Sequence, residues 1–197
     1  RCGLSGEVPA EVLGRCGCLV ELNLSRNNLW GEIPPSIGKC LRLRHIDLSQ
    51  NRLSGHLPSE ICLSSLRSLS CHENALSGEI PANLRFCSAL RRLVLHTNFF
   101  SGPLPEHLPL RLQLLMVHNN LLSGSLPDSI GGCLALTCLS CSQNELSGPI
   151  PESIGQCVSL QVLGLYQNRL SGEVPWQAIR SLLHLRKLGL HGNPALR

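Results

Sequence analysis

Arginine residues recur in this sequence at a nearly constant interval. Arg44, Arg67 and Arg91 are separated by 23 and 24 residues, and Arg92 directly follows Arg91. A guanidinium group donates paired hydrogen bonds to a carboxylate or a sulfate, which suits arginine to binding such groups. If the chain stacks one repeat on the next, these side chains form a cationic column. Such a column could bind an acidic ligand.

Histidines follow the same rhythm, because His72, His96 and His118 are separated by 24 and 22 residues. An imidazole changes its charge near pH 6.5 and is a common metal ligand. A flat row of rings does not match the tetrahedral geometry of zinc, so we predict no metal site. Two interpretations stay open for the two columns: an acid-sensitive binding face for an acidic ligand, or a solvated charged surface without a ligand.

Catalysis has little support in this chain. Ser49, His72 and Asp47 contain the residue types of a hydrolytic triad. No nucleophile elbow, glycine-rich phosphate loop or pair of catalytic carboxylates accompanies them. An open, flat face also lacks the water-excluding pocket that acid–base chemistry needs. We therefore predict that the chain is not an enzyme and binds no cofactor.

A repeated stretch must position these side chains. Residues 160–175, LQVLGLYQNRLSGEVP, follow the pattern LxxLxLxxNxLSGxxP. Self-similarity at this period and leucine spacing indicates a leucine-rich repeat solenoid. We expect a single domain over residues 1–197, without evident terminal caps. Its units are a partial repeat 1–18, full repeats 19–42, 43–65, 66–89, 90–111, 112–135, 136–159 and 160–184, and a truncated repeat 185–197.

Strand alternation decides which residues face a ligand. Within LxLxx, the leucines point into the core and the x residues point outward, because side chains alternate along a strand. Stacked repeats then form a parallel sheet whose outward residues make columns. Met116 and Tyr166 would supply apolar contacts beside the basic groups. The candidate ligand-binding residues are Arg44, His45, Arg67, His72, Arg91, Arg92, His96, Met116, His118 and Tyr166.

An asparagine ends each strand segment, where the chain must turn. A carboxamide both donates and accepts hydrogen bonds, so it can satisfy backbone groups that leave the sheet ladder. We predict a structural role for all of them, with Cys2 at the same step of the first, partial repeat. The column consists of Asn27, Asn51, Asn74, Asn98, Asn120, Asn144, Asn168 and Asn193.

The eleven cysteines also follow the repeat. A cysteine at one recurring phase behaves as a small buried hydrophobe. We expect mostly buried free thiols, with a few disulfides between successive coils as the alternative, and an outward position for Cys138. The cysteines at recurring phases are Cys16, Cys40, Cys62, Cys87, Cys133 and Cys157 before each repeat, and Cys71 and Cys141 inside strands.

Charge and composition exclude some classes of function. A net charge of +4 with 15% charged residues is too mild to predict nucleic-acid binding. No apolar run approaches the ~18 residues of a membrane span, and no signal-peptide pattern opens the chain. Asn23-Leu24-Ser25 is a weak glycosylation signal, relevant only to a secreted protein. The incomplete repeats at both ends lead us to expect a fragment of a longer array.

The full pattern, LxxLxLxxNxLSGxIPxxIGxC, resembles the plant-specific subclass of leucine-rich repeats. That subclass is found in receptor-like kinases, receptor-like proteins and polygalacturonase-inhibiting proteins. The resemblance implies an α/β repeat solenoid that is right-handed and curved, with a parallel β-sheet on the concave face. It also implies a second, shorter sheet and short 3₁₀ or irregular segments on the convex side.

By the same resemblance, the chain would be part of the extracellular, ligand-binding region of a receptor attached to the plasma membrane. The implied partners are a peptide or protein ligand and a second leucine-rich repeat protein as co-receptor. A secreted inhibitor of a microbial cell-wall-degrading enzyme and an intracellular scaffold are the alternatives. Related receptors often hold a peptide's carboxyl terminus with two arginines one residue apart. Arg42 and Arg44 have that spacing, but Arg42 precedes the first leucine of its repeat.

Overall fold

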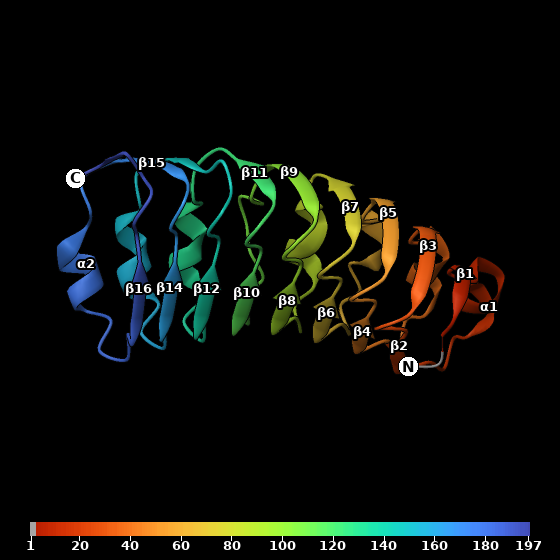
Figure 1. Ribbon diagram of the computed structural model, residues 1–197. Helices are drawn as coiled ribbons and strands as arrows, with labels where there is room; N and C mark the ends of the chain where they lie inside the picture. Colours follow the sequence, from red (N-terminus) through yellow and green to blue (C-terminus); the bar gives the residue numbers. More distant parts are fainter. Residues whose placement is uncertain (1–2) are drawn as a thin grey trace.

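The computed structural model describes residues 3–197 and forms one curved solenoid (Figure 1). Its main sheet has eight parallel strands in sequential order, so each connection advances the chain by one strand position. This confirms the predicted parallel sheet of a leucine-rich repeat array. The strands are β2 (Glu21–Asn23), β4 (His45–Asp47), β6 (Ser68–Ser70), β8 (Arg92–Val94), β10 (Leu114–Met116), β12 (Cys138–Ser140), β14 (Val162–Gly164) and β16 (Lys187–Gly189).

A second layer of parallel strands follows the SG step of the repeats. It is divided into two sheets, because β11 and β13 do not pair. One sheet contains β1 (Ser5–Glu7), β3 (Asn28–Glu32), β5 (Arg52–His56), β7 (Ala75–Gly78), β9 (Phe99–Pro103) and β11 (Leu121–Ser123). The other contains β13 (Ser147–Gly148), β15 (Arg169–Gly172) and β17 (Ala195–Leu196).

Short helices complete the coils, as the resemblance implies. They begin just after the proline of each repeat, whose fixed φ and missing N–H suit the start of a helix. The segment between β9 and β10 has only turns, and its repeat is two residues shorter than its neighbours. The helices are α1 (Ala10–Arg15), η1 (Pro35–Lys39), η2 (Ser59–Ile61), η3 (Ala82–Phe86), η4 (Asp128–Gly132), η5 (Glu152–Gln156) and α2 (Trp176–Arg180).

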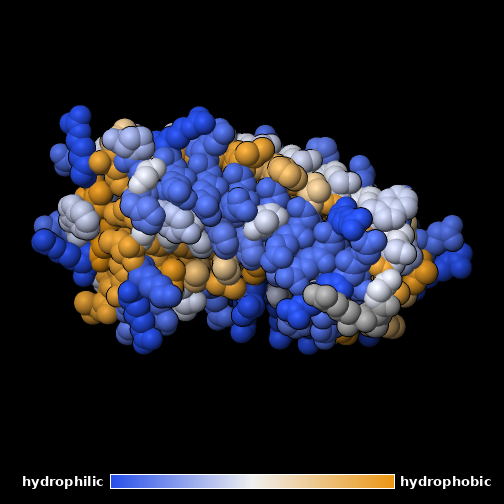
Figure 2. Space-filling view, in the orientation of Figure 1, coloured by the Kyte–Doolittle hydropathy of each residue, from blue (hydrophilic) through white to orange (hydrophobic). Residues whose placement is uncertain are grey.

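The core is a continuous column of aliphatic side chains between the layers. Leu93, Leu115 and Leu139 occupy the middle of central strands and are almost completely buried. The matching Leu22 and Leu188 of the outer strands are partly exposed, 39% in the case of Leu188, because no further coil covers them. Figure 2 shows apolar surface gathered at the end that carries α2 and β16. Across residues 3–197, no helix is long and apolar enough to cross a membrane.

The asparagines join successive coils through hydrogen bonds. Asn98 Nδ2 donates to the carbonyls of Cys71 and Leu95, at 3.0 and 3.1 Å, and its Oδ1 accepts from the backbone N–H of Leu76 at 3.0 Å. Each of the eight asparagines accepts in the same way from the backbone N–H of a residue in the preceding coil. Their side chains therefore satisfy backbone groups that the sheets do not pair.

The residue before each asparagine turns the chain out of the strand in a left-handed conformation. Seven such residues, none of them glycine, have φ between +54° and +58°. This conformation costs roughly 1 kcal/mol for a residue with a Cβ. The asparagine bonds on the next residue offset that cost in every coil. The seven are Arg26, Gln50, Glu73, Thr97, Asn119, Gln143 and Gln167.

The ten cysteines within residues 3–197 are free thiols. Burial raises the pKa of Cys133 and Cys157 to about 11 and that of Cys141 to about 12, so these thiols stay protonated at neutral pH. Cys138 is half-buried on the outward side of its strand. Cys2, which the sequence aligns with the asparagine column, lies outside the described residues.

Candidate ligand-binding face

Three positions of each repeat point outward from the concave sheet. They are the first and third residues of the strand and the second residue after it, because the middle residue is turned into the core. The parallel register aligns each position into a column across the solenoid. His45, Ser68 and Arg92 share the first column, and Asp47 and Ser70 share the second.

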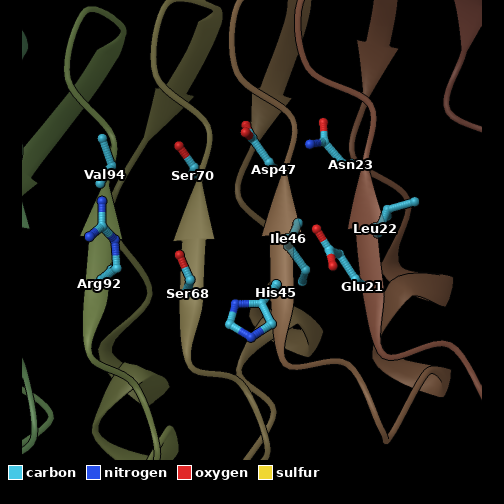
Figure 3. A pocket seen from close by; sticks show the side chains of 10 residues that line it. All are labelled: Glu21, Leu22, Asn23, His45, Ile46, Asp47, Ser68, Ser70, Arg92 and Val94. Carbon is cyan, nitrogen blue, oxygen red and sulfur yellow. The ribbon is translucent and has the colours of Figure 1, made fainter.

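A polar hollow of about 240 Å³ lies on this face near its amino-terminal end. Figure 3 shows Glu21, His45, Ser68 and Arg92 in one row across the strands, and Asn23, Asp47, Ser70 and Val94 in the next. Within residues 3–197 the only ion pair joins Arg169 to Glu145, so no salt bridge neutralises the charges in the hollow. They are free to bind a charged ligand.

Two side chains in the hollow are oriented by serines that follow their strands. Asp47 Oδ1 accepts hydrogen bonds from the hydroxyl and the backbone N–H of Ser49, at 2.6 and 3.0 Å. Asn23 Oδ1 accepts the same pair from Ser25, at 2.8 and 3.1 Å. These bonds hold the Asp47 carboxylate in a defined direction. Asn23 is the acceptor residue of the weak glycosylation signal, and a glycan attached to it would occupy the hollow.

The three histidines of the sequence column are stacked on one another. The ring centroids of His72 and His96 are 4.5 Å apart, and those of His96 and His118 are 4.3 Å apart with planes only 10° from parallel. Serine hydroxyls lie 3.0 Å from His72 Nδ1 and 3.1 Å from His118 Nδ1. The rings thus present a continuous, half-buried surface across β6, β8 and β10.

Packing suppresses the positive charge of His96 and His118. The pKa of His96 is lowered to about 4, chiefly by burial and also by the positive charges that His118 and His72 would carry, while Glu73 partly opposes this shift. The pKa of His118 is lowered too, by burial and by His72. His96 is therefore neutral at pH 6. The sequence suggested a cationic, acid-sensitive column, whereas the geometry makes its centre a neutral aromatic surface.

The arginine column lies one residue away from the expected position. Arg44, Arg67 and Arg91 are exposed, but each precedes the first residue of its strand. They remain aligned, since the backbone N–H of Arg67 donates to the carbonyl of Arg44 at 2.8 Å and that of Arg91 to Arg67 at 2.9 Å. They line the edge of the sheet where the strands begin. Arg42, farther from the strand, is also outside the concave columns.

Adjacent arginines consequently serve different surfaces. Arg92 is the first residue of β8 and lines the polar hollow on the concave face. Arg91 instead lines a separate hollow of about 480 Å³ with Leu110, Arg111 and Leu134. The alternation of side chains along an extended segment explains the split.

The outward positions of β10, β12 and β14 carry no acidic, lysine or arginine side chain, and Lys187 begins the last strand, β16. Leu114 and Met116 are half-buried in β10, and Val94 beside Met116 is 8% exposed. Tyr166 stacks on His191 with ring centroids 4.8 Å apart. These residues offer a ligand apolar and ring contacts.

No three histidine, cysteine or acidic side chains within residues 3–197 are placed to hold a metal ion. The stacked imidazoles point along a row and do not converge on one point.

Some residues of the hollow were absent from the candidates chosen by sequence. Glu21, Asp47, Ser68 and Ser70 line it together with the predicted His45 and Arg92. The same alternation that selects His45 and Arg92 also selects these four. The sequence pattern singled out the arginine and histidine columns, whereas these four residues form no column of one residue type. The hollow combines both signs of charge.

Comparisons with known proteins place this geometry in a family. The leucine-rich repeat model matches residues 18–40, 42–63, 65–87, 111–133 and 135–157, which together exceed half of the chain. A sequence comparison with curated proteins gives no match.

Solved structures align with nearly all of the chain. A TDR receptor structure matches with TM-score 0.91 and 33% identity, covering 96% of this chain and 33% of that one. The ectodomain of the plant membrane receptor kinase GASSHO1/SCHENGEN3 from Arabidopsis thaliana, in complex with CASPARIAN STRIP INTEGRITY FACTOR 2, matches with TM-score 0.81 and 35% identity, covering 97% and 26%.

The Arabidopsis receptor kinase HAESA, in complex with the peptide hormone IDA and the co-receptor SERK1, matches with TM-score 0.73 and 30% identity, covering 98% of this chain and 40% of that one. The chain spans less than half of the length of each of these structures. It belongs to the leucine-rich repeat family, and plant receptor kinase ectodomains are among its structural neighbours.

Proposed function

We propose that this chain is part of the ligand-binding extracellular region of a plant receptor-like kinase or receptor-like protein, and that it binds a peptide along its concave sheet. The observation that carries the proposal is the hollow in which Glu21, Asp47 and Arg92 face outward without ion-pair partners. Glu21 and Arg92 are exposed and Asp47 is half-buried, so a ligand can reach all three charged groups. The complexes of HAESA with IDA and of GASSHO1/SCHENGEN3 with its factor support it by similarity.

The face sets the length of the ligand. Eight strands about 4.8 Å apart extend over roughly 34 Å, and an extended chain advances about 3.3 Å per residue. A peptide of about ten residues therefore crosses the whole sheet. Shorter peptides would reach only the polar hollow or only the apolar half.

The face also sets the order of chemical groups. Arg92 and His45 suit the acidic group expected from sequence, and the neighbouring Glu21 and Asp47 add a place for a basic group. Beyond them the ligand meets the neutral rings of His96 and His118, and then Leu114 and Met116. The ligand is thus a peptide with adjacent acidic and basic residues at one end and apolar residues at the other. HAESA is found in complex with a co-receptor, SERK1, and the complex of this chain would likewise recruit a co-receptor, which the sequence resemblance implies is a second leucine-rich repeat protein.

Two adjacent arginines allow a matched test. A displayed library of random peptides about ten residues long is selected on the wild-type chain, and the enriched peptides are synthesised. Arg92→Ala should weaken their binding by about tenfold or more, since it removes a charged hydrogen-bonding partner. Arg91→Ala removes the same side chain from the edge and should leave binding unchanged.

The two variants also define failure. Equal affinity of wild type and Arg92→Ala for every enriched peptide would remove the concave face as the site. Enriched peptides that depend on Arg91 and not on Arg92 would move the site to the edge. Thermal unfolding of both variants, expected to match the wild type because both arginines are exposed, controls for folding.

A further inference from the structure

Large apolar side chains are exposed in a row along the edge where the strands of the main sheet begin. Leu110, Leu134, Val158 and Leu183 are 66%, 58%, 55% and 87% exposed. Each lies two residues before the first leucine of its repeat, so they occupy one position on four consecutive coils. We call these four residues the edge stripe. An exposed contiguous apolar patch on a soluble protein commonly marks an interaction site.

The backbone fixes the alignment of this stripe. In each coil the leucine that follows donates its N–H to the carbonyl three residues earlier: Leu112 to Pro109, Leu136 to Cys133, Leu160 to Cys157 and Leu185 to Leu182, at 2.9 to 3.1 Å. Every residue of the edge stripe is therefore held by the same tight turn. Leu110 and Leu134 already line one common hollow of about 480 Å³.

The amino-terminal coils lack this feature. Ser64 and Ser88 occupy the equivalent position in the two coils before Leu110. Leu41 occupies it one coil earlier and is 71% exposed, but the two serines separate it from the stripe. The uninterrupted apolar row is thus confined to the four coils that carry β10, β12, β14 and β16.

Charge is distributed along the stripe in a way that suits one kind of partner. Arg91 and Arg111 lie beside Leu110, and His184 and Arg186 lie beside Leu183. The flanking positions between them are uncharged, namely Ala135, Thr137, Ser159 and Gln161. No acidic residue occupies the stripe or these flanking positions. A complementary partner carries acidic groups at both ends of an apolar row.

Spacing selects the conformation of that partner. Four positions on coils about 4.8 Å apart extend over about 14 Å. A helix with apolar residues at i, i+3, i+7 and i+10 spans about 15 Å along its axis. Four alternate residues of an extended strand span about 20 Å, which is longer than the about 14 Å of the four coils, so their side chains would not align with the stripe.

We propose that the edge stripe is the docking site for an amphipathic α-helix of a protein partner, with acidic residues flanking its apolar face. The helix lies along the solenoid, perpendicular to the strands, and its four apolar residues contact Leu110, Leu134, Val158 and Leu183. Its acidic ends pair with Arg91 and Arg111 on one side and with His184 and Arg186 on the other. This surface is separate from the concave face, so both can be occupied together.

The probe is a synthetic peptide of about four helical turns, with leucines at i, i+3, i+7 and i+10 and glutamates at both ends. Its affinity is measured by fluorescence anisotropy against the wild-type chain. Saturable binding is expected, and Leu134→Ser should weaken it by about tenfold, because one large apolar contact is lost. Leu41 is 71% exposed and occupies the corresponding turn of a coil that lies outside the edge stripe. Leu41→Ser should therefore leave the affinity for the peptide unchanged.

Two further peptides test the chemistry. Replacing the glutamates by lysines should weaken binding by repulsion from the flanking basic groups. Proline substitution in the middle of the peptide prevents the helix and should abolish binding. The outcomes that overturn the proposal are no binding of the acidic helix, equal weakening by Leu41→Ser and Leu134→Ser, or equal binding of the proline peptide.

The variants of Arg91 and Arg92 distinguish binding of the helical peptide at the edge from binding of a peptide on the concave face. Arg92→Ala should leave binding of the helical peptide unchanged, whereas Arg91→Ala should weaken it. The opposite order would place the helix on the concave face and overturn the edge site. Failure of the concave face to bind any selected peptide would not alter the outcome at the edge.

Discussion

The asparagine column and the histidine column each repeat one residue type on consecutive coils, yet their side chains have different partners. Asn120 is buried, and it bonds to the backbone of its own coil and of the preceding one. His96 is half-buried, and it contacts two other rings and a threonine hydroxyl. Repetition along a solenoid therefore does not by itself separate scaffold from surface. The nature of the partners does.

The largest expected effect tests the scaffold side of this comparison. Asn120→Ala leaves the buried backbone N–H of Phe100 without its partner. It also removes one of the two asparagine donors to each of the carbonyls of Leu95 and Val117, which keep only Asn98 and Asn144. We expect a loss of about 2–4 kcal/mol in the free energy of unfolding, measured by urea denaturation.

The neighbouring residue supplies the control. Asn119 is exposed and has φ +56°, a conformation that glycine adopts freely. Asn119→Gly should therefore change the free energy of unfolding by less than about 0.5 kcal/mol. Similar losses in both variants would show that the asparagine bonds do not determine stability.

A smaller effect concerns the charge state of the stack. The folded-state pKa of His96, about 4, is below its ordinary value of 6.5. As the pH falls below 6.5 the unfolded chain takes up a proton that the folded chain refuses, so stability is lost between pH 6.5 and pH 4. Because the ring is about half-exposed, we expect a loss of roughly 1 kcal/mol. Urea unfolding at pH 7 and pH 4 should show this loss, and His96→Gln should reduce it.

The smallest effect is expected for the same variant at neutral pH. His96→Gln removes a neutral ring from a surface stack and leaves the asparagine bonds intact. The free energy of unfolding should change by less than about 0.5 kcal/mol, as for most surface substitutions. A loss comparable to that of Asn120→Ala would make the histidines part of the scaffold, and the distinction between the columns would fail.

The leucine spacing is sufficient to predict the main sheet, since a period-two pattern at a fixed repeat leaves one way to bury Leu93, Leu115 and Leu139 together. It does not show where hydrogen-bonded pairing begins. Arg91 and Arg92 both lie in the outward-looking part of the pattern, but only Arg92 is in the strand. The paired strands begin one residue after Arg44, Arg67 and Arg91, so these three predicted ligand-binding residues lie at the edge of the sheet.

Other features depend on packing that no repeat pattern contains. The stacking of His72, His96 and His118 depends on side-chain rotamers, and the resulting shift in the pKa of His96 follows from it. The missing helix between β9 and β10 follows from a repeat that is two residues shorter, a difference that the sequence shows but whose structural outcome it does not.

The asparagine bonds between coils also determine how the molecule comes apart. A coil bonded on both sides cannot open without breaking bonds to two neighbours, so adjacent coils resist local opening together. The polar hollow spans β2 to β8, whose coils are joined in this way. A peptide bound across these strands would stabilise the four coils as one cooperative unit.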